Sequence, residues 1–168
     1  MSSNTVAGKN RLAQIDEARL LEAVDARSQM LGWIVRIALE TGMRPSELVN
    51  LKWSQVDLQR RAVHLDTRCV PLSKTATEAF AAALANAARP ADCNLVFFGE
   101  QGRPYAFSNI FSRITKRLGL TADLRHEARC RLFERGLNII EVAGVTGHRD
   151  LRSLRRYTHL HHPDMGRR

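Results

Sequence analysis

The stretch "GHRDLRSLRRYTHL", residues 147–160, places one of the chain's two tyrosines among strong bases. Four arginines and two histidines share this stretch with Tyr157. A phenol, with a pKa of about 10, is a weak nucleophile at neutral pH. Neighbouring guanidinium groups would favour its phenolate form, and a histidine could move a proton. These residue types favour a tyrosine nucleophile that attacks an anionic group.

Three further residues could bind that anion: Arg44 in "TGMRPSEL", Arg125 in "DLRH" and His148 in "TGH". Two arginines could grip a phosphodiester bidentately and stabilise the charge of a pentacoordinate transition state. Such a set could cleave DNA with no metal ion and no nucleotide cofactor. Taken singly, each residue also has a structural interpretation: a solvated arginine, a histidine at a helix end, a packed tyrosine. Residue types alone therefore predict only a basic, helical nucleic-acid-binding protein.

The composition agrees with a polyanionic partner. The 168 residues include 26 Lys and Arg against 17 Asp and Glu, a formal net charge of +9. A basic excess of this size is typical of nucleic-acid-binding proteins, although a basic surface that serves only solubility is the alternative. The aromatic content of 6% argues against a single-strand binder that stacks on bases. The length fits one domain.

The sequence indicates a cytoplasmic protein without a membrane anchor. Its three cysteines, Cys69, Cys93 and Cys130, are scattered and odd in number, which indicates reduced thiols and no zinc site. No apolar run approaches the roughly 20 residues of a membrane span, and no signal peptide opens the chain. We expect no metal and no cofactor.

Hydrophobic periodicity predicts a mainly α-helical chain with one small antiparallel β-sheet, in the α+β class. Helices are expected at residues 14–26, 28–42, 44–53, 73–88, 106–120, 123–136, 138–146 and 151–157. Strands are expected at 62–65 and 69–73, as a hairpin, and at 94–98. The hairpin turn would be Asp66-Thr67, a poor choice because two-residue turns favour positive φ and hence Gly or Asn. Asp150 is expected to cap the last helix.

Two long segments carry a resemblance to a known family. "ALETGMRPSELVNLKWSQVDL" and "DLRHEARCRLFERGLNIIEVAGVTGHRDLRSLRRYTHL" resemble the two conserved boxes of the tyrosine recombinases, the phage integrase family. "RCVPLS" is similar to the strand that leaves the β-hairpin of that family. The resemblance places Arg44 and Arg125 on the two catalytic arginines, His148 on the Gly-His histidine and Tyr157 on the nucleophile. It covers roughly residues 10–160, in the order of the family.

The resemblance implies the tyrosine recombinase catalytic-domain fold over residues 11–160, between a flexible tail at 1–10 and a short basic tail at 161–168. The N-terminal domain that precedes it in relatives, the core-binding domain, would be absent. It also implies site-specific recombination of double-stranded DNA through a 3′-phosphotyrosyl intermediate, without a cofactor and as a tetramer on DNA. Further arginines are candidates for contacts with DNA phosphates: Arg68, Arg129, Arg149, Arg152, Arg155 and Arg156.

The sequence departs from the family at two functional positions. Relatives carry a catalytic lysine in the hairpin, where "HLDTRCVPLS" has none, and Lys74 lies beyond the second strand. Relatives also carry a histidine three residues before the second arginine, where this chain has Ala122. An arginine would replace that lysine poorly as a proton donor, because it hardly releases a proton.

Two explanations account for these departures: a degenerate integrase that only binds DNA, or loop residues that are missing from the sequence as given. A helix-turn-helix regulator would explain the charge and the helices, but it would not explain why Arg44, Arg125, His148 and Tyr157 match family positions in order. The leading hypothesis is therefore a tyrosine recombinase, with the DNA-binding remnant as the alternative.

Overall fold

A computed structural model describes residues 11–161 of the chain. The predicted tails, residues 1–10 and 161–168, lie outside the described residues apart from His161. The α-helices are α2 (Gln14–Arg27), α3 (Gln29–Thr41), α4 (Pro45–Val49), α5 (Lys74–Leu84), α6 (Phe107–Leu118), α7 (Leu124–Glu134) and α8 (Ile139–Thr146). The 3-10 helices are η1 (Trp53–Gln55), η2 (Glu100–Gly102) and η3 (Leu151–His161).

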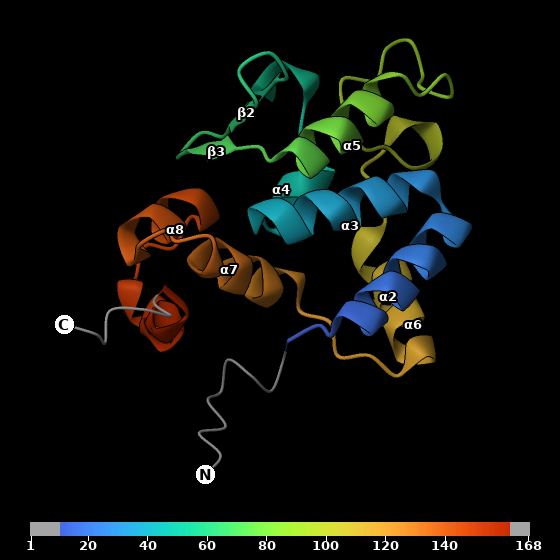
Figure 1. Ribbon diagram of the computed structural model, residues 1–168. Helices are drawn as coiled ribbons and strands as arrows, with labels where there is room; N and C mark the ends of the chain where they lie inside the picture. Colours follow the sequence, from blue (N-terminus) through green and yellow to red (C-terminus); the bar gives the residue numbers. More distant parts are fainter. Residues whose placement is uncertain (1–10, 162–168) are drawn as a thin grey trace, which may run out of the picture.

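Helix α3 is the central element of the core. Nine of its thirteen residues are buried, so it is apolar on nearly all sides and must be surrounded by other elements. Helices α2, α5 and α7 pack against it, as Figure 1 shows. The helix begins at Ser28, whose hydroxyl accepts a hydrogen bond from the Leu31 N–H, and ends at Gly42, whose φ of 66° places it in the left-handed region.

The sheet is small and antiparallel, as the sequence predicts, but its strand at Val56–Asp57 was not among the predicted strands. Its strands β1 (Val56–Asp57), β2 (Ala62–His64) and β3 (Cys69–Pro71) follow chain order, and Val63 pairs with Val70 in the hairpin. The Leu65 N–H donates to the Arg68 carbonyl at 2.9 Å and closes the turn at Asp66-Thr67. Neither turn residue is among the described non-glycine residues with positive φ, which are Arg61 and Gln101. The hairpin therefore closes without the backbone geometry that its short turn would favour.

Three sequence predictions need correction. Residues 94–98 do not join the sheet: Leu95 and Phe98 form only isolated bridges, while Val96 and Phe97 are fully buried. Apolar character at this segment reflects packing against the core rather than strand pairing. The helix expected at 44–53 ends at Val49, and the last helix is a 3-10 helix rather than an α-helix. The Asp150 cap is confirmed, because its Oδ1 accepts from the Arg152 N–H at 2.9 Å.

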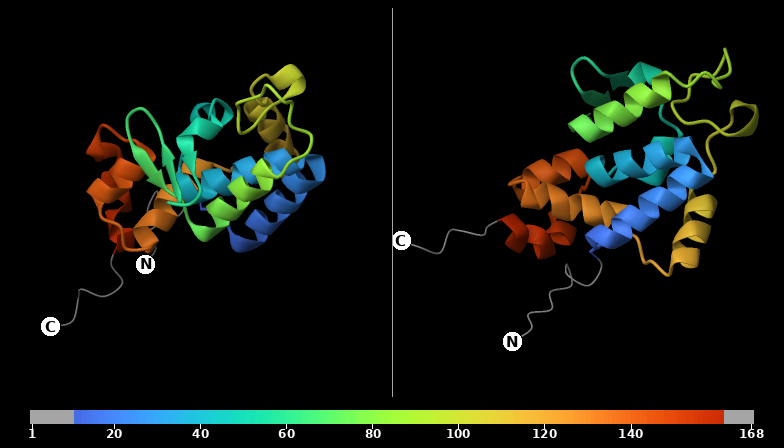
Figure 2. Two further views of the ribbon diagram at one scale, coloured as in Figure 1. Left: turned by 90° about the horizontal axis from the view of Figure 1, so that it is seen from above. Right: turned by 45° about the vertical axis from the view of Figure 1, so that its right-hand side comes forward.

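The C-terminal elements gather at one end of the molecule. Helices α7 and α8 pack against each other and against η3, and β3 lies against α8 (Figures 1 and 2). This arrangement brings together segments that are far apart in the sequence: the start of α4, the hairpin, the start of α7 and the end of α8. Among residues 11–161, no helix combines the length and apolar character that crossing a membrane requires.

Candidate active site

The site is built on the C-terminal end of α8, which stops at Gly147 with a φ of 74°. The last carbonyl groups of a helix have no partner within the helix and form the negative end of its dipole. Here three consecutive carbonyls each accept from one guanidinium: Val145 O from Arg68 Nε at 2.9 Å, Thr146 O from Arg125 Nη2 at 2.7 Å and Gly147 O from Arg44 Nη2 at 3.3 Å. The helix end therefore draws three arginines to one place.

Local structure orients two of these arginines. Arg44 is the N-cap of α4, where its backbone N–H donates to Glu47 Oε2 at 2.7 Å in a capping box. Arg125 lies in the first turn of α7, which begins at the capping residue Asp123. Its Nε also donates to the carbonyl of Gly42, at 3.0 Å. The ends of α3 and α8 thus fix the guanidinium of Arg125 from two sides.

Arg68 is held differently. Its two terminal nitrogens form a bidentate ion pair with Glu47, at 2.7 and 2.8 Å, and its side chain is only 8% exposed. Burial alone would raise the pKa of Glu47, but hydrogen bonds from Arg68 and from the Arg44 backbone outweigh burial and hold that pKa below its usual value. The structure therefore places Arg68, predicted as a contact for DNA phosphates, in the cluster with its donors already engaged. By contrast, the Arg44 side chain is 42% exposed.

His148 directly follows Gly147, and its hydrogen bonds define its tautomer. The Thr146 hydroxyl donates its single proton to the Val142 carbonyl at 2.8 Å, so at 2.6 Å from His148 Nδ1 it can only accept. Nδ1 therefore carries the imidazole proton and Nε2 carries a lone pair. Nε2 lies 3.2 Å from Arg129 Nη1, which donates to it. The result is a neutral imidazole whose basic nitrogen faces a guanidinium.

The electrostatics of the cluster agree with that assignment. Burial, together with the charges of Arg125 and Arg129, lowers the pKa of His148 to about 4. Burial and the charges of Arg44 and Arg129 lower the pKa of Arg125 to about 10, so that Arg125 stays protonated at neutral pH. Burial is the larger cause of both pKa shifts, and the repulsion among the arginines, which outnumber the nearby carboxylate of Glu47, adds to it. An anion placed among these groups would relieve this repulsion.

The lowered pKa of His148 predicts a pH dependence of stability. Between pH about 6.5 and about 4 the unfolded chain binds a proton at His148 that the folded chain does not bind. Stability should therefore fall as the pH falls through this window, and this contribution should be constant above it. In urea denaturation at several pH values, His148→Gln should show a shallower loss between pH 6.5 and 4 than the parent chain. Equal slopes would contradict a neutral His148.

Tyr157 lies next to the cluster but does not point its hydroxyl at it. The side chain is fully buried, its hydroxyl is 2.7 Å from His126 Nδ1 and its ring stacks on Phe133. The guanidiniums of Arg129 and Arg156 lie over the ring, 5.2 and 5.3 Å from its centroid. Arginines do surround the phenol, as its sequence suggests. They contact its ring, however, and the partner of the hydroxyl is a histidine.

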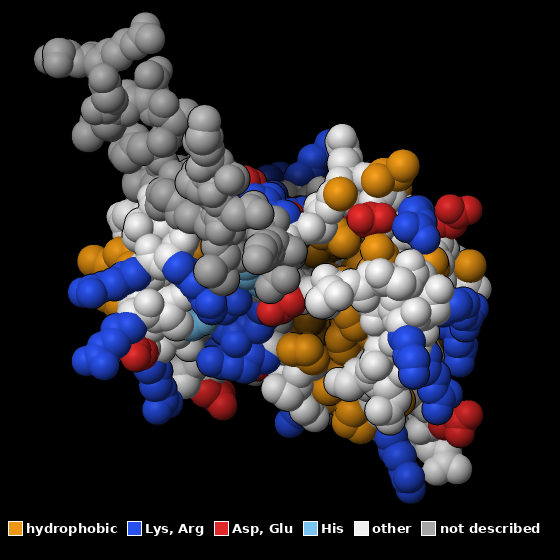
Figure 3. Space-filling view, turned by 90° about the horizontal axis from the view of Figure 1, so that it is seen from below, with side chains coloured by type: hydrophobic (Ala, Val, Ile, Leu, Met, Phe, Trp, Pro, Cys, Tyr) orange, Lys and Arg blue, Asp and Glu red, His pale blue; other side chains and the backbone are white. Residues whose placement is uncertain are grey.

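The remaining predicted arginines follow α8. Arg149, Arg152, Arg155 and Arg156 are exposed. Arg149 lines a hollow of about 300 Å³ together with His148, Arg68 and the hairpin residue Thr67. Figure 3 shows Lys and Arg side chains gathered beside histidine on one face of the molecule. Arg149, Arg152, Arg155 and Arg156 thus present exposed positive charge on the segment that directly follows the end of α8.

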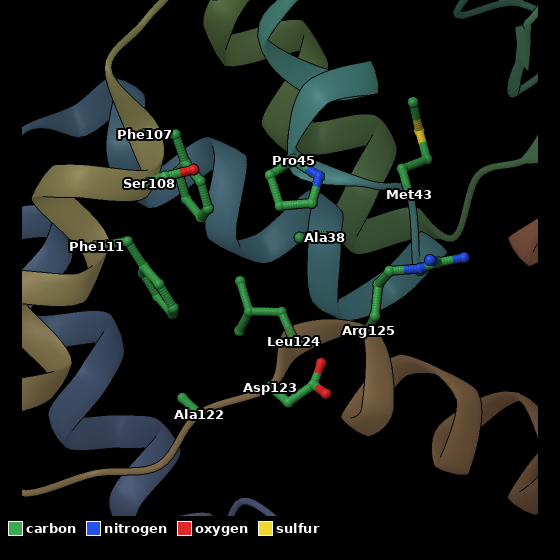
Figure 4. A pocket seen from close by; sticks show the side chains of 10 residues that line it. All are labelled: Ala38, Met43, Pro45, Phe107, Ser108, Phe111, Ala122, Asp123, Leu124 and Arg125. Atoms are coloured by element: carbon green, nitrogen blue, oxygen red, sulfur yellow. The ribbon is translucent and has the colours of Figure 1, made fainter.

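The two positions that depart from the family offer no replacement groups. The hairpin turn lies beside His148 through Thr67, but it carries no lysine, while Lys74 is exposed on α5 and pairs with Glu78 at 3.7 Å. Ala122 lines an apolar pocket of about 320 Å³ beneath the cluster. Figure 4 shows the guanidinium of Arg125 directed away from Ala122, past Met43.

Three residues of the site were not predicted from the sequence: Glu47, Thr146 and His126. Glu47 carried a usable signal, because the spacing Arg44-x-x-Glu47 is that of a capping box. Thr146 and His126 carried none. Their partners depend on how the end of α8 and the helix η3 pack against α7, which local pattern does not specify.

Gly147 offers a test of how the helix end holds the cluster. A Cβ atom there would lie 2.6 Å from Arg68 Nη1, at a backbone φ that side chains disfavour. We expect Gly147→Ala to destabilise the fold by about 1–2 kcal/mol or more from backbone strain alone. Gly144→Ala within α8, where nothing lies within 4 Å, should be neutral or stabilising by about 0.5–1 kcal/mol. Thermal unfolding of both variants measures the difference, and equal melting temperatures would contradict the prediction.

Comparison with known proteins agrees with this architecture. Residues 10–163 match the Phage integrase family. The shufflon-specific DNA recombinase of Escherichia coli is 36% identical over 161 residues, covering 89% of this chain and 40% of that protein. The tyrosine recombinase XerC of Lactobacillus delbrueckii subsp. bulgaricus is 31% identical over 153 residues, covering 76% of this chain and 49% of that protein. The chain thus spans half or less of these relatives.

Solved structures show the same fold. The catalytic domain of bacteriophage HP1 integrase is 27% identical and has a TM-score of 0.65, covering 89% of this chain and 87% of that one. XerA recombinase is 23% identical, with a TM-score of 0.74 over 89% of this chain and 58% of that one. The fold is thus that of a tyrosine recombinase catalytic domain. The chain belongs to the phage integrase family.

Proposed function

We propose that this chain cleaves and rejoins double-stranded DNA at specific sites, with Tyr157 as the nucleophile. The observation that carries the proposal is the convergence of Arg44, Arg125 and His148 at the end of α8, where positive charge is in excess. A phosphodiester is the anion that this family acts on. Structural neighbours of the chain include the Tn1549 transposon integrase in complex with circular intermediate DNA and XerH bound to its difH substrate.

In the proposed reaction the Tyr157 oxygen forms a bond to phosphorus, and the bond from phosphorus to the 5′-oxygen breaks. The phenol proton needs an acceptor, and the lone pair on His148 Nε2 provides one. The leaving 5′-oxygen needs a proton, which His148 can return, because arginine donates poorly and the hairpin has no lysine. Arg44 and Arg125 stabilise the charge on the non-bridging oxygens. A free 5′-hydroxyl reverses these steps, so no energy source is consumed.

The proposal is tested with a nicked DNA suicide substrate. Duplex fragments that carry the ends of the genetic element surrounding the gene are incubated with the protein and separated on a denaturing gel. A covalent adduct, mapped by mass spectrometry of its peptides to Tyr157, is the expected result. DNA binding without an adduct would instead support the alternative, a remnant that binds DNA and no longer cleaves it.

Binding should depend steeply on salt, because the exposed arginines after α8 are expected to contact phosphates. Neutralising several phosphates releases as many counterions, and the affinity falls by about 10³-fold or more between 50 and 200 mM salt when six or more contacts form. Titrations by fluorescence anisotropy at four salt concentrations measure this slope. An affinity that does not change with salt would contradict a phosphate-binding surface.

The proposal also covers the boundaries of the catalytic domain and its assembly on DNA. We propose residues 11–160 as the catalytic domain, and assembly into a tetramer on DNA by analogy with the family. Sedimentation of the protein with and without a duplex that carries the target site tests the assembly.

A further inference from the structure

Arg129 occupies an unusual place between the two groups that the proposed reaction uses. It lies on α7, one turn after Arg125. Its Nη1 donates to His148 Nε2 at 3.2 Å, and its Cζ lies 5.2 Å from the centre of the Tyr157 ring. The same guanidinium thus caps the basic nitrogen of the histidine and covers the face of the nucleophile. Neither group can take part in the proposed chemistry in this arrangement.

The guanidinium of Arg129 has no strong partner of its own. Its Nε is buried without a hydrogen-bond partner, and in residues 11–161 no carboxylate forms an ion pair with it. The carboxylate nearest the cluster, Glu47, is already engaged by Arg68 and Arg44. A neutral imidazole and an aromatic ring are weaker partners for a guanidinium than a phosphate oxygen, which forms shorter, charge-assisted hydrogen bonds.

We propose that Arg129 is a positioning residue that couples occupancy of the phosphate site to release of Tyr157. In the free chain it holds Tyr157 and His148 in a resting arrangement. A phosphodiester bound between Arg44 and Arg125 attracts Arg129 away from both groups. His148 Nε2 then becomes available for the phenol proton, and the Tyr157 ring loses its cover. The inference rests on the function proposed above.

Release of Tyr157 requires more than the withdrawal of Arg129. After Arg129 withdraws, the hydrogen bond to His126 and the stacking on Phe133 still hold the ring. The ring is carried by η3, an 11-residue 3-10 helix, whereas runs longer than about four residues are uncommon because their hydrogen bonds are poorer. The poorer hydrogen bonds of η3 lower the cost of moving it, but Tyr157 and Leu154 are fully buried, so the bonds that the guanidiniums form to a phosphate must offset the loss of their burial. Arg156 covers the ring too, but it is exposed and has no contact with His148.

The chain's two tyrosines allow a direct test with 3-fluorotyrosine and ¹⁹F NMR. Tyr105→Phe assigns the Tyr157 resonance by removing the other one. Solvent exposure is measured as the change in chemical shift between H₂O and D₂O. The probes are inorganic phosphate, with chloride at matched ionic strength as the control, and a 20-base-pair duplex. In the parent chain, the Tyr157 resonance should show a negligible solvent shift with chloride and a clear one with phosphate or duplex.

Two variants separate coupling from packing. Arg129→Leu should expose Tyr157 without any anion and abolish the response to phosphate. Arg156→Ala removes a comparable ring contact that is not linked to His148, and with inorganic phosphate at saturation it should keep the response. Because Arg156 is itself a proposed DNA contact, this variant is not tested with the duplex. The Tyr105 resonance reports whether each variant is folded. If Arg129→Leu does not fold, Arg129→Lys is used, which should weaken the response to phosphate at least several-fold.

A parent chain whose Tyr157 stays unexposed with phosphate and duplex would overturn the proposal, as would an Arg129 variant that responds like the parent. These outcomes are independent of cleavage. Adduct formation by a chain without the ¹⁹F response removes the role of Arg129 and leaves the proposed function intact. A normal ¹⁹F response without any adduct supports the role of Arg129 and contradicts the proposed cleavage.

Discussion

Tyr157→Phe is expected to abolish the covalent DNA adduct and to leave DNA binding unchanged. The phenol oxygen is the atom that would bond to phosphorus, and phenylalanine has no replacement for it. The substitution removes one hydrogen bond, to His126, which costs about 1 kcal/mol, and it keeps the ring that stacks on Phe133. The variant should therefore fold. Denaturing gels measure the adduct, and anisotropy measures binding.

The matched control for this variant is Tyr105→Phe, which removes the chain's other phenol. It should form the adduct at the parental rate. An adduct that persists in Tyr157→Phe would show that another residue is the nucleophile. Loss of the adduct in both variants would point to a general effect on folding, which circular dichroism would reveal.

Arg125→Ala is expected to reduce the cleavage rate by about 10³-fold, the order of effect seen when one preorganised group that stabilises transition-state charge is removed. Arg125 is half-buried and fixed by two carbonyl groups, so no neighbouring side chain can take its position. The same two carbonyls lose their donor in the variant. Stability should therefore fall by about 1–3 kcal/mol for each carbonyl that remains buried without a partner. Single-turnover cleavage and urea denaturation measure the two effects.

Arg125→Lys separates the contribution of the positive charge from that of the guanidinium geometry. A lysine keeps the charge but lacks the planar guanidinium that can hydrogen-bond two carbonyls and a phosphate at once. Cleavage should therefore remain strongly impaired, while affinity for DNA is largely retained. Arg113→Ala on α6, an exposed position, is the control and should cleave at the parental rate. A cleavage rate in Arg125→Ala within a few-fold of the parent would contradict the proposed role of Arg125.

The sequence predicted the helical framework well, because periodic apolar positions and capping residues are local signals. Helix α3, with its apolar surface and Gly42 stop, and helix α8, with its Asn138 capping box, are examples. Residues 94–98 were mistaken for a strand because a short apolar run looks the same whether it pairs in a sheet or packs as an irregular segment. Only the presence or absence of a partner strand decides this.

For the candidate site, the sequence identified which residues gather and not how they face one another. Arg44, Arg125 and His148 do converge at the end of α8. The orientation of the Tyr157 hydroxyl toward His126 was not predictable, because it depends on how η3 packs on α7. The partners of Arg68 were not predictable for a related reason, and its contact with DNA phosphates stays a prediction. Its pairing with Glu47 joins the hairpin turn before β3 to α4, and neither segment alone shows it.

The three guanidiniums that close the end of α8 have a consequence for how this lineage can change. Arg44, Arg68 and Arg125 each satisfy a carbonyl that would otherwise lack a partner, so selection for a folded chain preserves them even where selection for catalysis has ceased. A recombinase that has lost its activity would keep these arginines because they stabilise its fold. Residues without such a structural role, such as a lysine at the tip of the hairpin, would be the first to be substituted. Among proteins of this family, the residue at the hairpin tip should therefore indicate catalytic activity better than the three arginines do.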